Sequence, residues 1–268
     1  MRGAVIYYSN TGNTRLACEY LKSKITLVDF ELLDMRTSAV TDLSSYDVIG
    51  FAFFADSWKP SEIYMSYVRS LENTAGKYAF SFKTYGSSSG KAAYIMCRLL
   101  KEKGMKLIGS HALHTPENYP PMIQMGFAFS EYPKKHDMDK FDAFLTNLSD
   151  KLLCIQNGLP FIEKKPKMGL FTRLLPSDPK VLMQPVTGKI EMHVNAKECI
   201  RCGLCVRLCP VKAITTQKTG DESAVIDTSG CQKCWSCYNH CPSKAIQAGK
   251  YHGAAQYPEP SMEYRRKF

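Results

Sequence analysis

The chain has 268 residues, of which 44% are hydrophobic and 22% charged, a composition typical of globular proteins and not of disordered or fibrous ones. No hydrophobic run approaches the roughly 18 residues of a membrane-spanning helix, and no charged-then-apolar leader opens the sequence, so we expect a cytoplasmic protein without a membrane span. The formal net charge of +10 is spread over polar helix faces and a linker, which favours solvated surfaces; docking of an acidic partner protein is the alternative, and we expect no nucleic-acid partner.

Strands and helices alternate over roughly the first 158 residues. Short runs of apolar residues predict strands at Ala4–Tyr8, Thr26–Leu32, Asp47–Ala55, Lys77–Tyr85 and Met105–Ala112. Apolar residues at helical spacing predict one helix after Thr14, one that begins near Pro60, and two more at Lys91–Lys103 and Met138–Gln156. This alternation predicts a parallel sheet covered by helices on both faces. The polar stretch Thr37–Tyr46 is too short to predict as a helix.

The first predicted strand is followed by a turn rich in hydroxyl groups, which opens a helix. Its sequence is Ser9-Asn10-Thr11-Gly12-Asn13-Thr14. The free backbone N–H groups and the positive dipole end of a helix start bind phosphate, and Gly12 allows close approach of the backbone. No lysine follows the glycine and no G-x-G-x-x-G is present, so a nucleoside triphosphate or a dinucleotide is not indicated. A capped helix start without a ligand is the alternative.

At this position the turn resembles the FMN phosphate loop of flavodoxins, and the strand–helix alternation over residues 1–158 is similar to theirs. The resemblance implies a doubly wound, parallel, five-stranded sheet of order 2-1-3-4-5, with FMN at the carboxyl ends of its strands. It also implies two loops beside the flavin ring, at residues 55–60 and 83–90. Candidate ring contacts in these loops are Ala55, Trp58, Thr84, Tyr85 and Gly86. For the two aromatic residues, packing in the core is the alternative.

The proline-rich stretch His111–Met125 departs from simple flavodoxins. Long loops at the ligand edge of such a sheet often line the cofactor site, so Asn118 and Tyr119 are candidates for contact with the flavin or a substrate. We expect His111 to pack in the core or at the sheet edge. His114 is expected on a surface loop, where it could donate a proton.

Residues 159–187 are predicted to form a linker, because they contain several prolines and lysines and little periodicity. Apolar side chains within it indicate that it lies against one domain: Phe161, Leu170, Phe171, Leu174 and Leu175. Three cysteines outside the repeat described next, Cys18, Cys97 and Cys154, fall on apolar helix faces and are expected to be buried and inert.

Eight of the eleven cysteines form two copies of C-x-x-C-x-x-C-x-x-x-C-P, related by 231 − 199 = 32 residues. The first copy holds Cys199, Cys202, Cys205 and Cys209, and the second holds Cys231, Cys234, Cys237 and Cys241. This spacing is typical of [4Fe–4S] ligation, in which the fourth cysteine binds the other cluster. An odd cysteine count with such runs indicates thiolate ligation in a reducing compartment. Zinc is the alternative, but its sites use two C-x-x-C pairs and do not require the remaining cysteines.

Residues 188–250 resemble bacterial-type ferredoxins, which implies a small α+β fold with two [4Fe–4S] clusters. Short strands are expected at Ile190–Val194 and Ala224–Asp227. By this resemblance, one cluster is held by Cys199, Cys202, Cys205 and Cys241, and the other by Cys231, Cys234, Cys237 and Cys209. Trp235 and Tyr238 are expected to shield the clusters from water. Residues 251–268 form a polar and aromatic tail that either folds back or contacts a partner.

Together the two parts resemble the flavodoxin–ferredoxin fusion proteins of anaerobic bacteria and archaea. The resemblance implies an iron–sulfur flavoprotein that relays low-potential electrons between its clusters and FMN, to or from a redox partner protein such as a ferredoxin or an acceptor enzyme. The alternative is an FMN-dependent reductase of a small substrate, fed by the clusters; in either case we expect an oxidoreductase. Bound clusters and a flavin phosphate would lower the net charge to about +4, which weakens the nucleic-acid interpretation.

Overall fold

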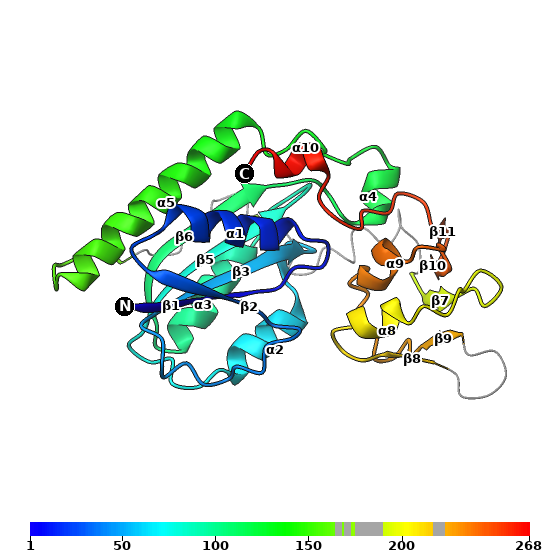
Figure 1. Cartoon of the computed structure of the whole chain (residues 1–268), viewed down its shortest axis with the longest axis horizontal. Coiled ribbons are helices and arrows are strands. Elements are labelled where there is room, and N and C mark those ends of the chain that lie inside the picture. The colour runs from blue at the N-terminus through cyan, green and yellow to red at the C-terminus, as the bar shows by residue number, and fades with distance from the viewer. Residues whose placement is uncertain (164–167, 169–172, 175–189, 217–222) are drawn as a thin grey trace.

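The computed structural model describes residues 1–163, 168, 173–174, 190–216 and 223–268. Most of the predicted linker, with Leu170, Phe171 and Leu175, lies outside the described residues. Figure 1 shows a larger α/β domain with a smaller module beside it. Within the described part of the chain, no helix combines the length and the apolar character that crossing a bilayer requires.

The larger domain is built on a parallel sheet. Its strands are β1 (Arg2–Tyr7), β2 (Asp29–Asp34), β3 (Val48–Asp56), β5 (Tyr78–Tyr85) and β6 (Lys106–His114). Their spatial order is β2-β1-β3-β5-β6, and all neighbours on this path pair in parallel. The two-residue strand β4 (Lys59–Pro60) pairs antiparallel with β3, off this path. Without β4, the five strands have the order 2-1-3-4-5 in chain numbering, which confirms the predicted doubly wound topology.

Helices cover both faces of this sheet. On one side lie α2 (Glu62–Ser70) and α3 (Ala92–Glu102), and on the other α1 (Asn13–Lys24) and α5 (Lys135–Gln156). Successive residues of β1 alternate between the two cores: Ala4 and Ile6 pack with α2 and α3, whereas Val5 packs with α1 and α5. Because both faces are buried, the strands appear in the sequence as continuous apolar runs. The short helix α4 (Pro120–Gln124) lies between β6 and α5.

Three boundaries differ from the predictions. β2 begins at Asp29, opposite Arg2 of β1, because residues 25 and 28 pack in the core below the sheet instead of joining it. Pro60 lies in β4, and α2 begins two residues later, where the Ser61 hydroxyl accepts a hydrogen bond from the Tyr64 N–H. β6 runs to residue 114 because its last residue still pairs with Tyr85.

The smaller module repeats one unit of two strands and a helix. The first copy contains β7 (Met192–Val194), α8 (Leu204–Leu208) and β8 (Ile214–Thr216), and the second contains β9 (Ala224–Ile226), α9 (Ser236–His240) and β10 (Ile246–Ala248). β7 pairs with β10, and β8 pairs with β9, so each strand pair takes one strand from each copy. This exchange makes the two copies one folding unit with a shared core.

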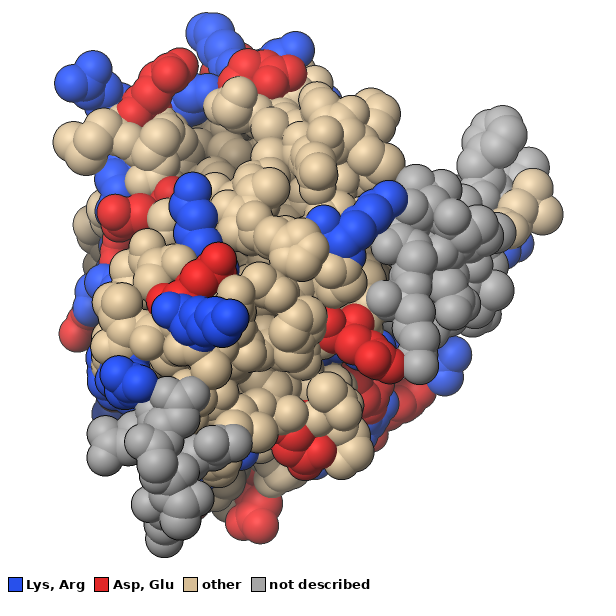
Figure 2. Space-filling model, turned by 90° about the vertical axis from the view of Figure 1, so that its right-hand side faces the viewer, with Lys and Arg blue, Asp and Glu red and all other residues tan. Residues whose placement is uncertain are grey.

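Two elements follow the module. β11 (Tyr251–His252) pairs with β10, although the sequence places it in the tail. The last helix, α10 (Met262–Arg265), lies beside α1 of the larger domain in Figure 1. Figure 2 shows the module end of the molecule, where Lys and Arg side chains are interspersed with Asp, Glu and uncharged residues. Among the described residues on this face, positive charge is therefore mixed with negative charge and does not gather in one patch.

Candidate functional site

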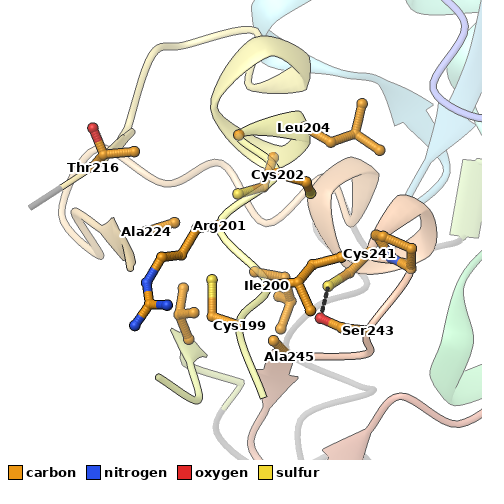
Figure 3. Close-up of a pocket in the computed structure, with 15 residues that line it drawn as sticks. Cys199, Ile200, Arg201, Cys202, Leu204, Thr216, Ala224, Cys241, Ser243 and Ala245 are labelled. Atoms are coloured by element: carbon orange, nitrogen blue, oxygen red, sulfur yellow. Dashed lines mark hydrogen bonds between the residues drawn. The ribbon is translucent and has the colours of Figure 1, made fainter. Parts of the chain in front are cut away.

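The eight cysteines of the repeat line two cavities in the module. The outer cavity is lined by Cys199, Cys202, Cys205 and Cys241 (Figure 3). The inner cavity is lined by Cys209, Cys231, Cys234 and Cys237. Each copy therefore contributes three cysteines to one cavity and its fourth to the other. The four cysteines at each cavity are the set that the resemblance to bacterial-type ferredoxins implied for one cluster. Their ligation of iron stays a prediction.

Left-handed backbone turns produce this arrangement in both copies. Arg201 and Gly203 have φ angles of 59° and 66°, and Lys233 and Trp235, which lie 32 positions later, have φ angles of 54° and 64°. These turns wrap the first three cysteines of each copy around a single cavity. A short helix then carries the chain to the fourth cysteine at the opposite cavity.

The donor set fits a polyatomic cluster better than a single ion. Among the described residues, no three His, Cys, Asp or Glu side chains converge closely enough to hold one metal ion. Zinc would need four ligands about 2.0–2.3 Å from one point. Burial raises the pKa of Cys234 to about 11 and that of Cys237 well above its usual value.

The two cavities differ in their surroundings. Cys202 at the outer cavity is exposed, and α8 contains no buried residue. In α9 at the inner cavity, by contrast, residues 236–239 are all buried. The larger domain covers the second copy and leaves the first copy at the surface, so the inner cavity lies on the side of the phosphate loop.

The predicted phosphate loop is a compact turn at the carboxyl end of β1. Gly12 has a φ of 98° and precedes the first residue of α1. The Ser9 hydroxyl accepts hydrogen bonds from the backbone N–H groups of Gly12 and Arg15, at 3.1 and 3.3 Å. The Thr14 and Thr84 hydroxyls lie 2.9 Å apart, which joins this loop to the end of β5.

Polar groups in this loop remain unpaired although they are buried. Asn10 is 5% exposed, and its side-chain oxygen has no hydrogen-bond partner among the described residues. Asn13 and Thr14 are the first two residues of α1, where the backbone N–H groups of a helix have no partner within the helix. Buried donors and acceptors are seldom left unpaired, so their presence favours a ligand with both phosphate oxygens and hydroxyl groups. The loop therefore fits the phosphate and the sugar-alcohol chain of a flavin nucleotide.

The two loops that the resemblance places beside a flavin ring touch each other. Residues 55–60 form a hairpin in which Ala55 pairs with Pro60. Ser57 and Trp58 at its tip have φ angles of 50° and 67°, which costs roughly 1–2 kcal/mol for each residue with a side chain. A Cβ on Gly90 would lie 2.5 Å from the Trp58 Cα, so the second loop packs directly on this strained tip. Strain of this kind is common where a loop holds a ligand.

Tyr85, in the second loop, stacks on His114 with a centroid distance of 4.8 Å. His114 also stacks on Tyr132 at 3.5 Å, so the expectation of a surface-loop histidine is wrong. The reason is the longer β6, which buries this ring between aromatic neighbours. Burial also lowers the pKa of His114.

Two buried charged residues that the sequence analysis missed support the second loop. The Glu117 carboxylate accepts hydrogen bonds from the backbone N–H groups of Ser87, Asn118 and Tyr119, at 3.0–3.1 Å. Burial raises the pKa of Glu117. Lys83, which is 2% exposed, donates to the Ser89 carbonyl at 2.7 Å, and burial lowers its pKa to about 8. In the sequence, Lys83 could have been found as a charged residue within an apolar strand, whereas Glu117 has no such signal.

Asn118 and Tyr119 lie where the domain meets the module. The Asn118 amide donates to the Thr11 hydroxyl at 2.8 Å, so it orients the phosphate loop. The Tyr119 ring packs edge-on against Trp235, with centroids 5.4 Å apart. Contact of either residue with a flavin stays a prediction.

A short path of contacts connects the inner cavity to the phosphate loop. The Asn10 amide donates to the Cys234 carbonyl at 2.8 Å, across the boundary between domain and module. Tyr8 is fully buried, and its hydroxyl lies within hydrogen-bond reach of the Cys234 thiol. Burial and the neighbouring thiol raise the pKa of Tyr8 well above its usual value. Asn10 therefore belongs to the predicted phosphate loop and also contacts Cys234, a predicted cluster ligand.

Other expected positions are mostly confirmed. His111 lies in β6 between Phe141 and Phe144, and burial lowers its pKa to about 4. Cys18 and Cys97 are buried, but Cys154 is only partly buried because it lies near the end of α5.

Trp235 and Tyr238 are buried in the module core, and Trp235 lines the inner cavity. In the linker, Phe161 packs on Tyr78, whereas Leu174 is 79% exposed.

Comparison with known proteins identifies the module. Residues 198–245 match the family of 4Fe-4S dicluster domains. No curated protein sequence matches the chain significantly.

Among solved structures, a flavodoxin from the domain Archaea is 20% identical, with 57% of this chain and 99% of that chain covered and a TM-score of 0.42. A two-electron reduced flavodoxin from Megasphaera elsdenii is 24% identical, with coverages of 47% and 97% and a TM-score of 0.40. A flavoprotein in complex with FMN from Lactobacillus acidophilus is 18% identical, with coverages of 41% and 92% and a TM-score of 0.35. The assignment of the larger domain rests on its strand order and not on these scores.

The sheet order β2-β1-β3-β5-β6 is the flavodoxin-like one, and the module carries the cysteines of a 4Fe-4S dicluster domain. The chain therefore joins a domain of flavodoxin-like fold to a module that belongs to the 4Fe-4S dicluster domains, the arrangement of a flavodoxin–ferredoxin fusion.

Proposed function

We propose that this protein transfers electrons between two [4Fe–4S] clusters and FMN. The route runs from a cluster in the outer cavity, at the surface, through a cluster in the inner cavity to the flavin site. The observation that carries this proposal is the hydrogen bond from Asn10 of the phosphate loop to the carbonyl of Cys234 at the inner cavity. When bound, the clusters supply one-electron transfer, and a flavin accepts electrons singly or in pairs.

The residues of the chain have separate tasks in this arrangement. The eight cysteines hold iron, and backbone N–H groups donate to their sulfurs: Ala213 to Cys209 at 3.2 Å, and Lys233 to Cys231 at 3.4 Å. Such hydrogen bonds help to set a cluster's potential. Trp235 and Tyr238 exclude water from the inner cavity.

The exposure of the two copies supports the order of the route. A redox partner must approach one of the cavities closely, because electron transfer slows steeply with distance. Only the outer cavity presents an exposed cysteine, Cys202, and beside it Ile200 is 61% exposed. We therefore assign the partner protein to the outer cavity; the flavin end exchanges electrons with the second partner or with a small substrate.

The first test is the composition of protein prepared without oxygen. We expect about eight iron and eight sulfide per chain together with one FMN. Zinc in place of iron and sulfide, or the absence of bound flavin from protein supplied with FMN, would contradict the proposal.

The second test separates the cavities. Cys209→Ser should impair the inner cluster, and Cys241→Ser the outer one, although each residue belongs to the other copy of the repeat. Electron paramagnetic resonance of the reduced variants measures which cluster signal remains. Loss of the outer-cluster signal in Cys209→Ser, or of the inner-cluster signal in Cys241→Ser, would refute the crossed assignment.

The third test separates a relay from a reductase. The chemically reduced protein is mixed with a small electron acceptor, with and without an oxidised ferredoxin. Rapid oxidation by ferredoxin alone supports the relay, and turnover of the small acceptor without ferredoxin supports the reductase.

A further inference from the structure

The C-terminal tail, residues 254–268, crosses from the module to the larger domain and ends beside α1 (Figure 1). Its first part is held by the module. The Tyr238 hydroxyl donates to the Ala254 carbonyl at 2.9 Å, and the Gln256 amide donates to the Tyr238 and Cys241 carbonyls, at 2.6 and 3.0 Å. Of the two module residues, Cys241 lines the outer cavity, so the tail begins beside that cavity.

The middle of the tail lies on the phosphate loop. The Tyr257 hydroxyl donates to the Asn13 side-chain oxygen at 2.8 Å, and the Asn13 amide donates to the Pro116 carbonyl at 3.0 Å. Both ends of the Asn13 side chain are therefore fixed. Pro260 lies over Gly12, since a Cβ built on Gly12 would come within 2.8 Å of the proline Cδ.

The end of the tail is anchored in the larger domain. Tyr264 is 1% exposed, and the Phe268 ring packs edge-on against Tyr20 of α1 at 5.4 Å. Ser261 caps α10 by accepting a hydrogen bond from the Tyr264 N–H at 3.1 Å. These contacts hold the covering segment between two fixed points.

This cover explains the burial of the loop. Ser9, Asn10, Thr11, Asn13 and Thr14 are each no more than 5% exposed, although they form a turn at the edge of the sheet. A phosphate bound there would be shielded from water, which strengthens its hydrogen bonds to the backbone N–H groups.

We propose that the tail completes the flavin-phosphate site, with Tyr257 as a positioning residue that orients Asn13 and Pro260 as the cover over Gly12. This inference rests on the proposed function, because it assumes FMN at the loop. Asn13 is the first residue of α1, and fixing its side chain fixes the backbone N–H groups that face the phosphate. The phosphate can then enter or leave only after residues 257–260 move aside.

The test compares FMN with riboflavin, which has the same ring system but no phosphate. The full chain, depleted of flavin and retaining its iron, is titrated with each compound, and the quenching of flavin fluorescence gives the dissociation constants. We expect Tyr257→Phe to weaken FMN binding roughly tenfold, the effect of one lost hydrogen bond, and to leave riboflavin binding unchanged. Release of FMN should be faster in Pro260→Gly than in the unaltered protein.

Tyr264→Phe is the matched control. It lies in the same tail and is buried, and its hydroxyl has no hydrogen-bond partner among the described residues. We expect it to bind both compounds as the unaltered protein does.

Three results would overturn the inference. Equal weakening of FMN and riboflavin binding in Tyr257→Phe would mean that the tail only stabilises the fold, and unchanged binding of both would mean that it does not act on the site. If the unaltered protein binds neither compound, the proposed function fails, and this inference fails with it. The first two results leave the proposed function intact.

Discussion

At the scale of single residues, buried polar groups mark the site better than the exposed ones do. Tyr8, Asn10 and Glu117 are all buried, and each lies in or beside the loops that we assign to the flavin. Burying such groups costs free energy. Three backbone N–H groups compensate Glu117, whereas the Asn10 side-chain oxygen has no partner among the described residues and needs a ligand to meet it. Two predictions follow from individual side chains.

The first concerns Tyr8, whose hydroxyl lies beside Cys234. With a cluster in the inner cavity, this hydroxyl can donate to the Cys234 sulfur and stabilise the reduced, more negative form. Tyr8→Phe should therefore lower the reduction potential of the inner cluster and leave that of the outer cluster unchanged. A redox titration monitored by electron paramagnetic resonance measures both potentials, and Tyr64→Phe, whose hydroxyl donates to the Ile6 carbonyl, is the control.

The second concerns His111, whose pKa burial lowers from 6.5 to about 4. Between pH 6.5 and about 4, His111 binds a proton in the unfolded chain but not in the folded one. The free energy of unfolding therefore decreases as the pH falls through this range. His111→Phe keeps the stacking on Phe141 and Phe144 without a titrating group. We expect its unfolding free energy to exceed that of the unaltered protein by a growing margin, on the order of 1 kcal/mol at pH 5.5, in urea unfolding at pH 7.5 and 5.5. An equal pH dependence of the two proteins would contradict the assignment.

At the scale of elements, close packing of loops fixes the geometry at the ring site. The tip of the β3–β4 hairpin contacts Gly90 so closely that no other residue fits there. Gly126 also has a positive φ, of 90°, but nothing lies within 4 Å of a Cβ built on it. A substitution at Gly126 therefore adds backbone strain alone, whereas one at Gly90 adds both backbone strain and steric overlap with Trp58.

Gly90→Ala should be more destabilising than Gly126→Ala. The second substitution costs only the left-handed backbone penalty of about 1–2 kcal/mol, whereas the first adds overpacking of about 1–3 kcal/mol. Thermal unfolding measures the difference. Gly90→Ala should also weaken riboflavin binding, because it moves the loop beside the ring; equal effects of the two substitutions would argue against direct contact of the loops.

At the scale of the whole molecule, the two halves of the repeat have diverged with their surroundings. Asn239, in α9, is 2% exposed; its amide donates to the Asn118 carbonyl, and its oxygen accepts from the Tyr257 N–H. The residue 32 positions earlier is Arg207, which is exposed. One asparagine thus joins the module, the larger domain and the tail.

Asn239→Ala should loosen the module from the larger domain. It leaves a buried carbonyl and a buried N–H unpaired, at roughly 1–3 kcal/mol each. We expect faster limited proteolysis of the variant and slower electron transfer between cluster and flavin, measured by stopped-flow absorbance. Arg207→Ala, at the matching position of the other copy, should change neither; an effect of similar size there would contradict the assignment of the interface.

Features that depend on local spacing could be predicted from the amino-acid sequence. Strand–helix alternation predicted a parallel sheet covered on both faces, and the resemblance to flavodoxins implied its doubly wound order. The cysteine repeat was readable from its spacing, and the resemblance to bacterial-type ferredoxins implied which four cysteines gather at each cavity. The pattern also predicted a turn with a glycine between the first strand and the first helix, which the structure has; phosphate binding by this turn stays a prediction.

Three features could not be predicted without the folded structure: which cavity faces the larger domain, what supports the loops at residues 55–60 and 83–90, and where the tail lies. These features depend on contacts between residues far apart in the chain: Asn10 with Cys234, Glu117 with Ser87, and Tyr257 with Asn13. A single asparagine or tyrosine has no periodicity that would reveal its partner. Its role becomes visible only when folding removes both groups from water and forces them to pair with each other.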